Sequence, residues 1–282
     1  MRSRAYEHTL NSSAVPVGHP VLQIRDVELR FGGVVALHDV GFEVTQGHIH
    51  SVIGPNGAGK SSLLNCVSGL YHPQRGSIRL HTGGTGSVEA THELTALPPY
   101  RIARLGVARS FQNIELFSQL TVLENLMLGR HTRMRHGVLS SLVWFGPARA
   151  QEIANRGIVE EVIDLLSLQP FRHLPVGALA YGIQKRVELG RALCLQPSLL
   201  LLDEPMAGMN SEEKEDMARY ILDVHELAGV TVILIEHDMA VVMDISDRVS
   251  VLDFGRLIAD GTPDEVKVNP AVVEAYLGAE DL

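Results

Sequence analysis

One short segment of this chain has residues at the spacing of a phosphate-binding loop. It reads Gly54-Pro55-Asn56-Gly57-Ala58-Gly59-Lys60-Ser61, which matches the pattern GxxxxGK[ST]. Glycines at these positions let the backbone curl so that successive N–H groups point at phosphate oxygens, and the N-terminus of a following helix adds positive potential. The lysine reaches the terminal phosphates and the serine hydroxyl can ligate Mg²⁺. We therefore predict a nucleotide phosphate site that includes Lys60, Ser61 and the adjacent Ser62.

Two carboxylates follow a buried apolar run later in the chain. Leu199–Leu202 has the composition of a buried parallel strand, and Asp203 and Glu204 come directly after it. Open α/β sheets bind ligands at the carboxyl edge of their strands. Asp203 suits a role in holding Mg²⁺, and Glu204 suits a general base that polarises an attacking water. Without the phosphate-binding loop, an exposed acidic turn would explain the pair equally well.

Three more features fall in an order that constrains the class. Gln112 follows the first half of the expected sheet, and His237 ends a second buried strand, where an imidazole could contact a terminal phosphate. A lone histidine at a strand end is more often structural, so its assignment depends on the whole set. The third feature is Leu179-Ala180-Tyr181-Gly182-Ile183-Gln184, which opens a helix, and a glycine at a helix N-terminus is another possible phosphate seat.

The hydrophobic pattern predicts the elements that position these residues. A β-like pattern runs from Val21 to Val44, and a strand at 49–53 and a helix at 60–70 are expected after it. After Pro175 the pattern predicts a helix that stops before Pro197, strands at 199–202 and 230–235 with a helix between them, and a hairpin at 249–258. Strands that alternate with amphipathic helices indicate an α/β sheet.

The middle of the chain is helical in character. Thr121 and Glu124 form a capping-box pattern, and apolar residues recur at helical spacing from Ile158 to Leu166. Thr262 and Glu265 repeat the capping pattern near the C-terminus. The apolar stretch 137–145 has two readings, a short packed helix or a surface for a partner helix, and the sequence does not decide between them.

Composition limits the function classes. The chain has 282 residues, 45% hydrophobic and 20% charged, which is typical of a folded globular protein. Its net charge of −9 disfavours a generic nucleic-acid binder. Cys66 and Cys194 have no CxxC spacing, so buried thiols in a reducing compartment are expected. No apolar run approaches a membrane span and residues 1–20 read as a polar tail without a signal core, which predicts a cytoplasmic chain.

The order of the five motifs resembles that of the ATP-binding cassette (ABC) ATPases. The resemblance covers about residues 21–280, and five ordered motifs make it specific. It implies an α/β fold with a P-loop NTPase core, an antiparallel β-subdomain, and a helical subdomain inserted at about 114–180. It also implies ATP and Mg²⁺ as cofactors. Two ATPase subunits would pair head to tail, with each ATP between the P-loop of one subunit and the signature segment of the other.

The resemblance also implies roles for individual residues. Gln112 matches the glutamine that couples nucleotide state to a transmembrane partner, and we count it among both the nucleotide contacts and the Mg²⁺ ligands. Asp203 would assist Mg²⁺, Glu204 would be the catalytic base and His237 the switch histidine, with Lys60 also in catalysis. Phe31 matches the aromatic residue that stacks on adenine, although an ordinary core position is the alternative.

The signature segment departs from the commonest family form, Leu-Ser-Gly-Gly-Gln. Ala180 stands in place of the serine, Tyr181 in place of the first glycine and Ile183 in place of the glutamine. Loss of the hydroxyl removes one donor to a phosphate, worth about 0.5–1.5 kcal/mol or more to a charged group. Because Gly182 and the helix amides remain, we expect weaker or slower engagement of the second subunit's ATP, with the site still active.

Several segments are similar to the branched-chain amino-acid importer ATPases. They are Leu-Ala-Tyr-Gly at 179–182, Arg-Phe-Gly-Gly at 30–33, Ile-Glu-His-Asp-Met at 235–239 and Glu-Ala-Tyr-Leu-Gly at 274–278. The similarity implies the ATP-hydrolysing subunit of an ABC importer for branched-chain or related small amino acids. Its partners would be transmembrane permease subunits, a second ATPase (a different homologous chain or an identical copy) and, indirectly, a periplasmic or extracellular substrate-binding protein. The chain would lie at the cytoplasmic face of the plasma membrane, held there by the permease.

Other functions fit parts of the same pattern. An importer for amides or urea would use a similar ATPase, and a soluble, non-transport ABC protein would act on nucleic acid or ribosomes. Such soluble proteins usually carry two cassettes or a long coiled-coil insertion, and the acidic balance also disfavours a nucleic-acid partner. A non-catalytic, nucleotide-gated binding module is the third alternative, and retention of Glu204 and His237 argues against it.

Overall fold

The computed structural model describes residues 17–83, 90–110, 116–130 and 147–277. Gln112, the apolar stretch 137–145 and residues 1–16 of the expected tail lie outside the described residues. The strands are β1 (Pro20–Phe31), β2 (Val34–Thr45), β3 (Ile49–Ile53), β4 (Arg75–Thr82), β5 (Ala90–Glu93), β6 (Val107–Arg109), β7 (Leu199–Asp203), β8 (Thr231–Ile235), β9 (Arg248–Asp253) and β10 (Arg256–Gly261). The helices are α1 (Lys60–Val67), α2 (Pro99–Arg104), α3 (Val122–Arg130), α4 (Pro147–Leu165), α5 (Tyr181–Leu193), α6 (Ser211–Ala228), α7 (Met239–Ile245), α8 (Pro263–Lys267) and α9 (Pro270–Leu277).

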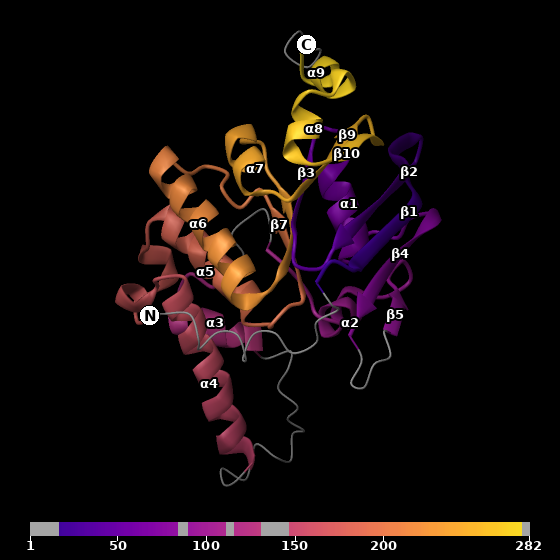
Figure 1. The fold of residues 1–282 in the computed structure, drawn as a ribbon. Coiled ribbons are helices and arrows are strands. Elements are labelled where there is room, and N and C mark those ends of the chain that lie inside the picture. Colours follow the sequence, from indigo (N-terminus) through magenta and orange to yellow (C-terminus); the bar gives the residue numbers. More distant parts are fainter. Residues whose placement is uncertain (1–16, 84–89, 111–115, 131–146, 278–282) are drawn as a thin grey trace.

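A six-stranded sheet forms the centre of the molecule. Its order is β10-β9-β3-β8-β7-β6, and every neighbouring pair is parallel except β9 and β10 (Figure 1). Every residue of β3, β7 and β8 is buried, and most of them are Leu, Ile or Val, as expected for central parallel strands covered on both faces. Because these strands are parallel, the residues that follow them meet at one edge of the sheet.

A second sheet is antiparallel, with the order β2-β1-β4-β5. The β-like pattern predicted between Val21 and Val44 is confirmed, because β1 and β2 are continuous strands of twelve residues each. Irregularities in their pairing interrupt the alternating pattern, and Asp26 and Asp39 have positive φ angles of 52° and 57°. Such bulges shift the alternation of buried and exposed positions by a residue, so the apolar residues within each strand are unevenly spaced.

The first helix is shorter than the sequence predicts. A helix over 60–70 is expected, but α1 ends at Val67 and is followed by Gly69 with a φ of 76°. A Cβ at Gly69 would lie 2.7 Å from both the Ile102 side chain and the Leu97 carbonyl oxygen. The helix therefore ends where the chain turns to pass close to α2, and Leu70 lies outside the helix.

Both predicted capping boxes are confirmed. The Thr121 hydroxyl accepts from the Glu124 amide while the Glu124 carboxylate accepts from the Thr121 amide, and Thr262 with Glu265 repeats the arrangement at α8. The buried thiols of Cys66 and Cys194 are also confirmed, and burial raises the pKa of each to about 12. In the part of the chain described here, no helix combines the length and apolarity needed to cross a bilayer.

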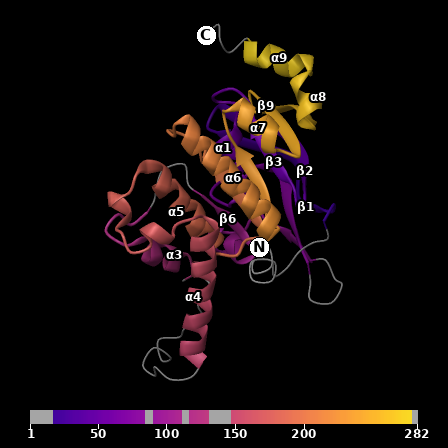
Figure 2. The same ribbon diagram turned by 60° about the vertical axis from the view of Figure 1, so that its left-hand side comes forward.

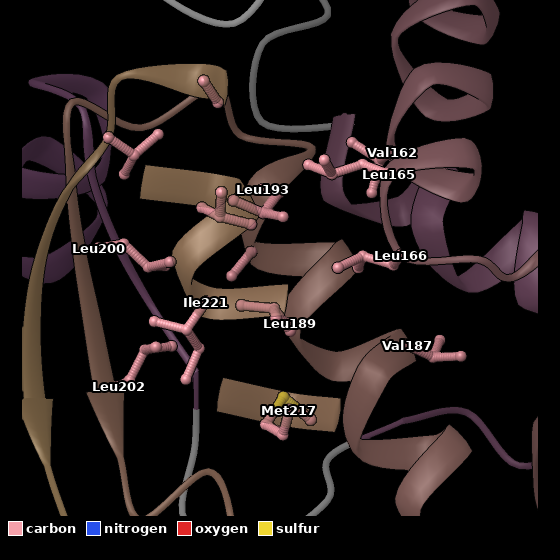
Figure 3. Close-up of a cluster of buried hydrophobic side chains, with 14 of the residues drawn as sticks. Val162, Leu165, Leu166, Val187, Leu189, Leu193, Leu200, Leu202, Met217 and Ile221 are labelled. Atoms are coloured by element: carbon pink, nitrogen blue, oxygen red, sulfur yellow. The ribbon is translucent and has the colours of Figure 1, made fainter. Parts of the chain in front are cut away.

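Helices α3, α4 and α5 lie together at one side of the central sheet (Figures 1 and 2). Figure 3 shows Leu189 and Leu193 of α5 between Leu166, which follows α4, and the β7 side chains Leu200 and Leu202. These residues belong to one buried apolar cluster, whereas α1 packs into a different cluster with β1, β2 and β4. The helices around α5 are thus anchored to the sheet through a core of their own.

Candidate nucleotide site

The motif residues meet at the carboxyl edge of the six-stranded sheet. The loop 54–59 follows β3, Asp203 ends β7, and His237 lies two residues after β8, which stands between β3 and β7. The paired register aligns Asp203 with Ile235, so the residues that follow these two strands are neighbours. The prediction that two buried strands deliver Asp203, Glu204 and His237 to one edge is confirmed by this arrangement.

Two glycines of the loop are required by its close approach to neighbouring backbone. Gly54 has a φ of 145°, and a Cβ there would lie 1.9 Å from the Leu252 carbonyl oxygen. Gly59 has a φ of 100°, and its Cβ would lie 2.6 Å from the Ala36 carbonyl oxygen. No L side chain fits either position without a shift of the surrounding strands. The loop is thus wedged against β2 and β9, with Asn56 and Gly57 exposed at its tip.

Lys60 is the first residue of α1 and lies across the loop. Its Nζ donates to the carbonyl oxygens of Gly54 at 2.6 Å and Pro55 at 2.9 Å. Burial lowers the pKa of Lys60, whereas the carboxylates of Glu204 and Asp203 act in the opposite direction. The ammonium group is therefore held at the loop and in the field of both carboxylates, where it can bind phosphate.

Asp203 joins the loop to the far side of the sheet. The Ser61 hydroxyl donates to its Oδ1 at 3.4 Å, and Arg109 Nη2 donates to its Oδ2 at 2.8 Å. Arg109 Nη1 also donates to Asn65 and Ser68 of the α1 region, at 2.5 and 3.1 Å. A hydroxyl and a carboxylate oxygen are ligands that Mg²⁺ prefers, so this pair fits the cation that accompanies nucleotide phosphates. No role was assigned to Arg109 from the sequence.

Glu204 and His237 form a carboxylate–imidazole pair at the site. His237 Nε2 lies 2.8 Å from Glu204 Oε1, and the side chains are 45% and 19% exposed. Glu204 has a φ of 51°, in the left-handed region that a non-glycine residue enters at some cost. Its backbone amide still donates to the Ile235 carbonyl at 2.9 Å, which keeps it in line with β8. The structure thus brings together two residues that sequence reasoning linked only through the motif set.

The signature segment lies elsewhere in the molecule. Tyr181 and Gly182 open α5, with Ala180 as the preceding residue, and α5 packs in the helical cluster away from α1 (Figure 1). A Cβ at Gly182 would lie 2.6 Å from the Glu213 carboxylate, so glycine lets α5 begin close to α6. The Tyr181 ring lies beside Gly208, which follows the Asp203–Glu204 turn. Within one chain, Ala180, Tyr181 and Gly182 are not brought to the P-loop.

Two further residues, Phe31 and Gln112, are predicted to contact the nucleotide. Phe31, at the end of β1, is 46% exposed and meets Tyr71 edge-on with ring centroids 5.0 Å apart. It is not a core side chain, and its ring is accessible for stacking. Sequence reasoning missed Tyr71, which has only its aromatic character as a signal. Gln112 is outside the described residues, three positions after Arg109, which ends β6.

The fold and this edge define a P-loop nucleotide-binding protein with an added antiparallel sheet and helical cluster. The ABC transporter family matches residues 37–207, and the branched-chain amino acid ATP-binding cassette transporter family matches residues 256–281. The chain is 38% identical to the high-affinity branched-chain amino acid transport ATP-binding proteins BraF of Pseudomonas aeruginosa and LivG of Escherichia coli. In both comparisons 93% of this chain and 99% of the relative are covered.

Solved structures agree with this grouping. The crystal structure of an ABC transporter cassette in its ADP conformation superposes with a TM-score of 0.77 at 28% identity, over 92% of this chain and 99% of that one. A nucleotide-free cassette gives a TM-score of 0.76 at 27% identity with the same coverage. The chain belongs to the ABC transporter family, in the branch of the branched-chain amino acid transport ATP-binding proteins. It binds ATP and is an ATPase.

Proposed function

We propose that the chain is the ATP-hydrolysing subunit of an importer for branched-chain amino acids. The observation that carries this proposal is the Glu204–His237 pair, 2.8 Å apart, at the same sheet edge as the P-loop and Asp203. A module that only bound nucleotide would not need a carboxylate and an imidazole in contact there. The substrate class comes from the relatives, which are named as branched-chain amino acid transport proteins.

The residues divide the work of phosphoryl transfer to water. Lys60 and the loop amides hold the β- and γ-phosphates, and the hydroxyl of Ser61 with the carboxylate of Asp203 would hold Mg²⁺. When bound, that ion neutralises charge on the phosphate oxygens. Glu204 orients a water and polarises it toward the terminal phosphate. His237 holds the Glu204 carboxylate through its ring nitrogen, so that the water is positioned rather than free.

A second cassette completes the site in this proposal. The segment 180–182 does not reach the P-loop of its own chain, so the amides at the start of α5 and the backbone of Gly182 would face the ATP of a second subunit. Ala180 supplies no hydroxyl there, which weakens that contact by about 0.5–1.5 kcal/mol. The second subunit is either a different homologous chain or another copy of this one. We favour a different homologous chain, as the similarity to the branched-chain importers implies.

The permease would dock beside the end of β6. A hollow of about 180 Å³ lies there, lined largely by apolar side chains of α2 and β6, and Arg109 and Leu195 also line it. A second hollow, of about 260 Å³, shares these two residues and reaches α3 and α5. Gln112, three residues after Arg109 in sequence, is the residue that would couple this contact to the nucleotide in the proposal. In this proposal the chain lies at the cytoplasmic face of the membrane through that contact alone.

Uptake in cells lacking this chain tests the proposal. The host gene is deleted, and uptake of radiolabelled leucine, isoleucine and valine is measured beside acetamide and urea. Wild-type chain and Glu212→Gln, a change on the exposed first turn of α6, should restore branched-chain uptake, whereas Glu204→Gln should not. Restored uptake of acetamide or urea alone would move the substrate class. Unchanged uptake of all five in the deletion strain would overturn the transport role.

A further inference from the structure

Glu236 is a buried carboxylate that the mechanism above does not use. It follows directly after β8, a fully buried strand that ends in four apolar residues, and is only 5% exposed. An ionisable group in such surroundings is costly unless hydrogen bonds compensate for the lost water. Its neighbour in sequence is His237, and the Glu204 carboxylate is close enough to act on its pKa, which burial raises. Glu236 is therefore a close neighbour of the Glu204–His237 pair.

The two oxygens of Glu236 bind backbone amides of two different segments. Its Oε1 accepts from the Met206 N–H at 2.8 Å, in the turn that follows Glu204. Its Oε2 accepts from the N–H of His237 at 3.1 Å. Hydrogen bonds to an ionised carboxylate are stronger than those between neutral groups. One side chain thus ties together the two stretches of chain that carry the catalytic base and the histidine.

The turn after Glu204 is the part that needs such support. Glu204 has a φ of 51°, a conformation that persists only where the surroundings enforce it. The Ala207 amide closes the turn by donating to the Glu204 carbonyl at 3.2 Å, and the Met206 side chain is fully buried. The hydrogen bond from the Met206 amide to Glu236 joins this turn to the segment after β8 that contains His237.

We propose that Glu236 is a positioning residue that sets the Glu204–His237 contact by holding the backbone of both. This inference rests on the roles proposed above for Glu204 and His237. Glutamine at this position would offer one carbonyl oxygen and one NH₂ group. It can accept only one of the two amides well and turns a donor toward the other. The positioning role therefore predicts a change in rate without a change in ATP binding.

The test compares ATP hydrolysis by the full-length chain and its Glu236→Gln variant. We expect kcat to fall at least tenfold while KM for ATP stays within threefold and the unfolding temperature stays near that of the wild type. Glu93→Gln is the matched control, because Glu93 also accepts a backbone amide of another strand, that of Ile78 at 2.9 Å, within the antiparallel sheet. It should leave kcat unchanged. If Glu236→Gln does not fold, Glu236→Asp, too short to reach both amides, should show the same loss of kcat.

A double variant separates positioning from a general weakening of the fold. Because Glu236 acts through Glu204, adding Glu236→Gln to Glu204→Gln should lower the residual rate by less than twofold. A wild-type kcat in Glu236→Gln, a rise in KM instead, or full multiplication of the two losses would overturn the inference. If Glu204→Gln is inactive and Glu236→Gln is normal, only the inference fails. If Glu204→Gln hydrolyses normally, the proposed role of Glu204 fails and this inference falls with it.

Discussion

Strand β3 carries a polar network around the buried His50 near its amino end and the P-loop at its carboxyl end. Near the amino end, His50 lies 2.8 Å from the Ser250 hydroxyl, which donates to Asp260 at 3.0 Å, and Arg248 forms two hydrogen bonds with that same carboxylate. The imidazole also stacks on Phe42. The polar atoms in these contacts face one another, and His50 is completely buried.

The carboxyl end has contacts of similar length, but some of its side chains are partly exposed. Asp203 is held by Arg109, and Glu204 meets His237, yet the His237 side chain is 45% exposed and Ser61 and Asp203 present oxygens beside the loop. Asp203 is buried, whereas Glu204 and His237 are held by their mutual contact and stay partly accessible. The contrast implies that changes near the amino end of β3 alter stability, and that changes at the carboxyl end alter rate.

The sharpest test of the contrast is Glu204→Gln. The amide keeps the size of the side chain but cannot take a proton from water, so kcat should fall by about 10²–10⁴-fold, the contribution typical of general base catalysis. ATP binding and the unfolding temperature should remain near their wild-type values. Steady-state hydrolysis with a fluorescent nucleotide titration measures both properties, and Glu212→Gln provides the control. A wild-type kcat would show that the base lies elsewhere.

His50 provides the opposite result, a pH-dependent loss of stability. Burial lowers the pKa of His50 to about 4, with Arg248 and His48 adding to that and Asp260 opposing it. Between pH 6.5 and 4 the unfolded chain binds a proton that the folded chain does not, so stability is lost as the pH falls through that window. At pH 5 the loss from this group is about 2 kcal/mol.

Urea unfolding at pH 7 and pH 5 tests that value. Wild type and His50→Gln share every other ionisable residue, so the informative quantity is the difference between the two proteins. Glutamine keeps a hydrogen-bonding side chain at position 50 without a titrating one. The variant should lose about 2 kcal/mol less between the two pH values and should hydrolyse ATP normally at pH 7. Equal losses in the two proteins would mean that His50 is not buried in its neutral form.

The two ends of β3 also differ in what the sequence could predict. The P-loop is a local pattern, and the Asp203–Glu204 pair follows a continuous apolar run, so both can be recognised without tertiary information. Arg109 and Glu236 could not be assigned, because their partners lie 94 and 30 positions away in sequence. The sequence offered one sign of a role for them, which is a charged residue directly after a run of apolar residues. The bulges in β1 and β2 could not be located within the β-like region for a related reason, since strand pairing rather than composition decides where they fall.

Phe31 tests whether the antiparallel sheet contributes to the nucleotide site. Its exposed ring would stack on adenine, and base–aromatic stacking is worth about 1–3 kcal/mol. Phe31→Ala should therefore weaken ATP binding about 5- to 150-fold, with kcat at saturating ATP retained. Tyr100→Ala, which removes another exposed ring from α2, should leave the dissociation constant unchanged. Unaltered ATP affinity in Phe31→Ala would confine the site to the six-stranded sheet.

The smallest expected effect marks where the catalytic region ends. Asn210 caps α6 by accepting from the Glu213 amide at 3.0 Å, only four residues after Met206, whose amide binds Glu236. Asn210→Ala should lower the free energy of unfolding by about 1 kcal/mol, as loss of an N-cap does elsewhere. The Met206 amide bond does not involve this side chain, so kcat should stay within twofold of wild type.

Thermal unfolding and steady-state hydrolysis of Asn210→Ala, with the exposed neighbour Ser211→Ala as control, decide the point. A loss of stability at constant kcat places the helix cap with the His50 network, as a structural feature near the site. A fall in kcat at constant unfolding temperature would instead extend the positioned segment from Glu204 through the whole turn to the start of α6. In that case backbone order, and not only the Glu236 carboxylate, would set the contact with His237.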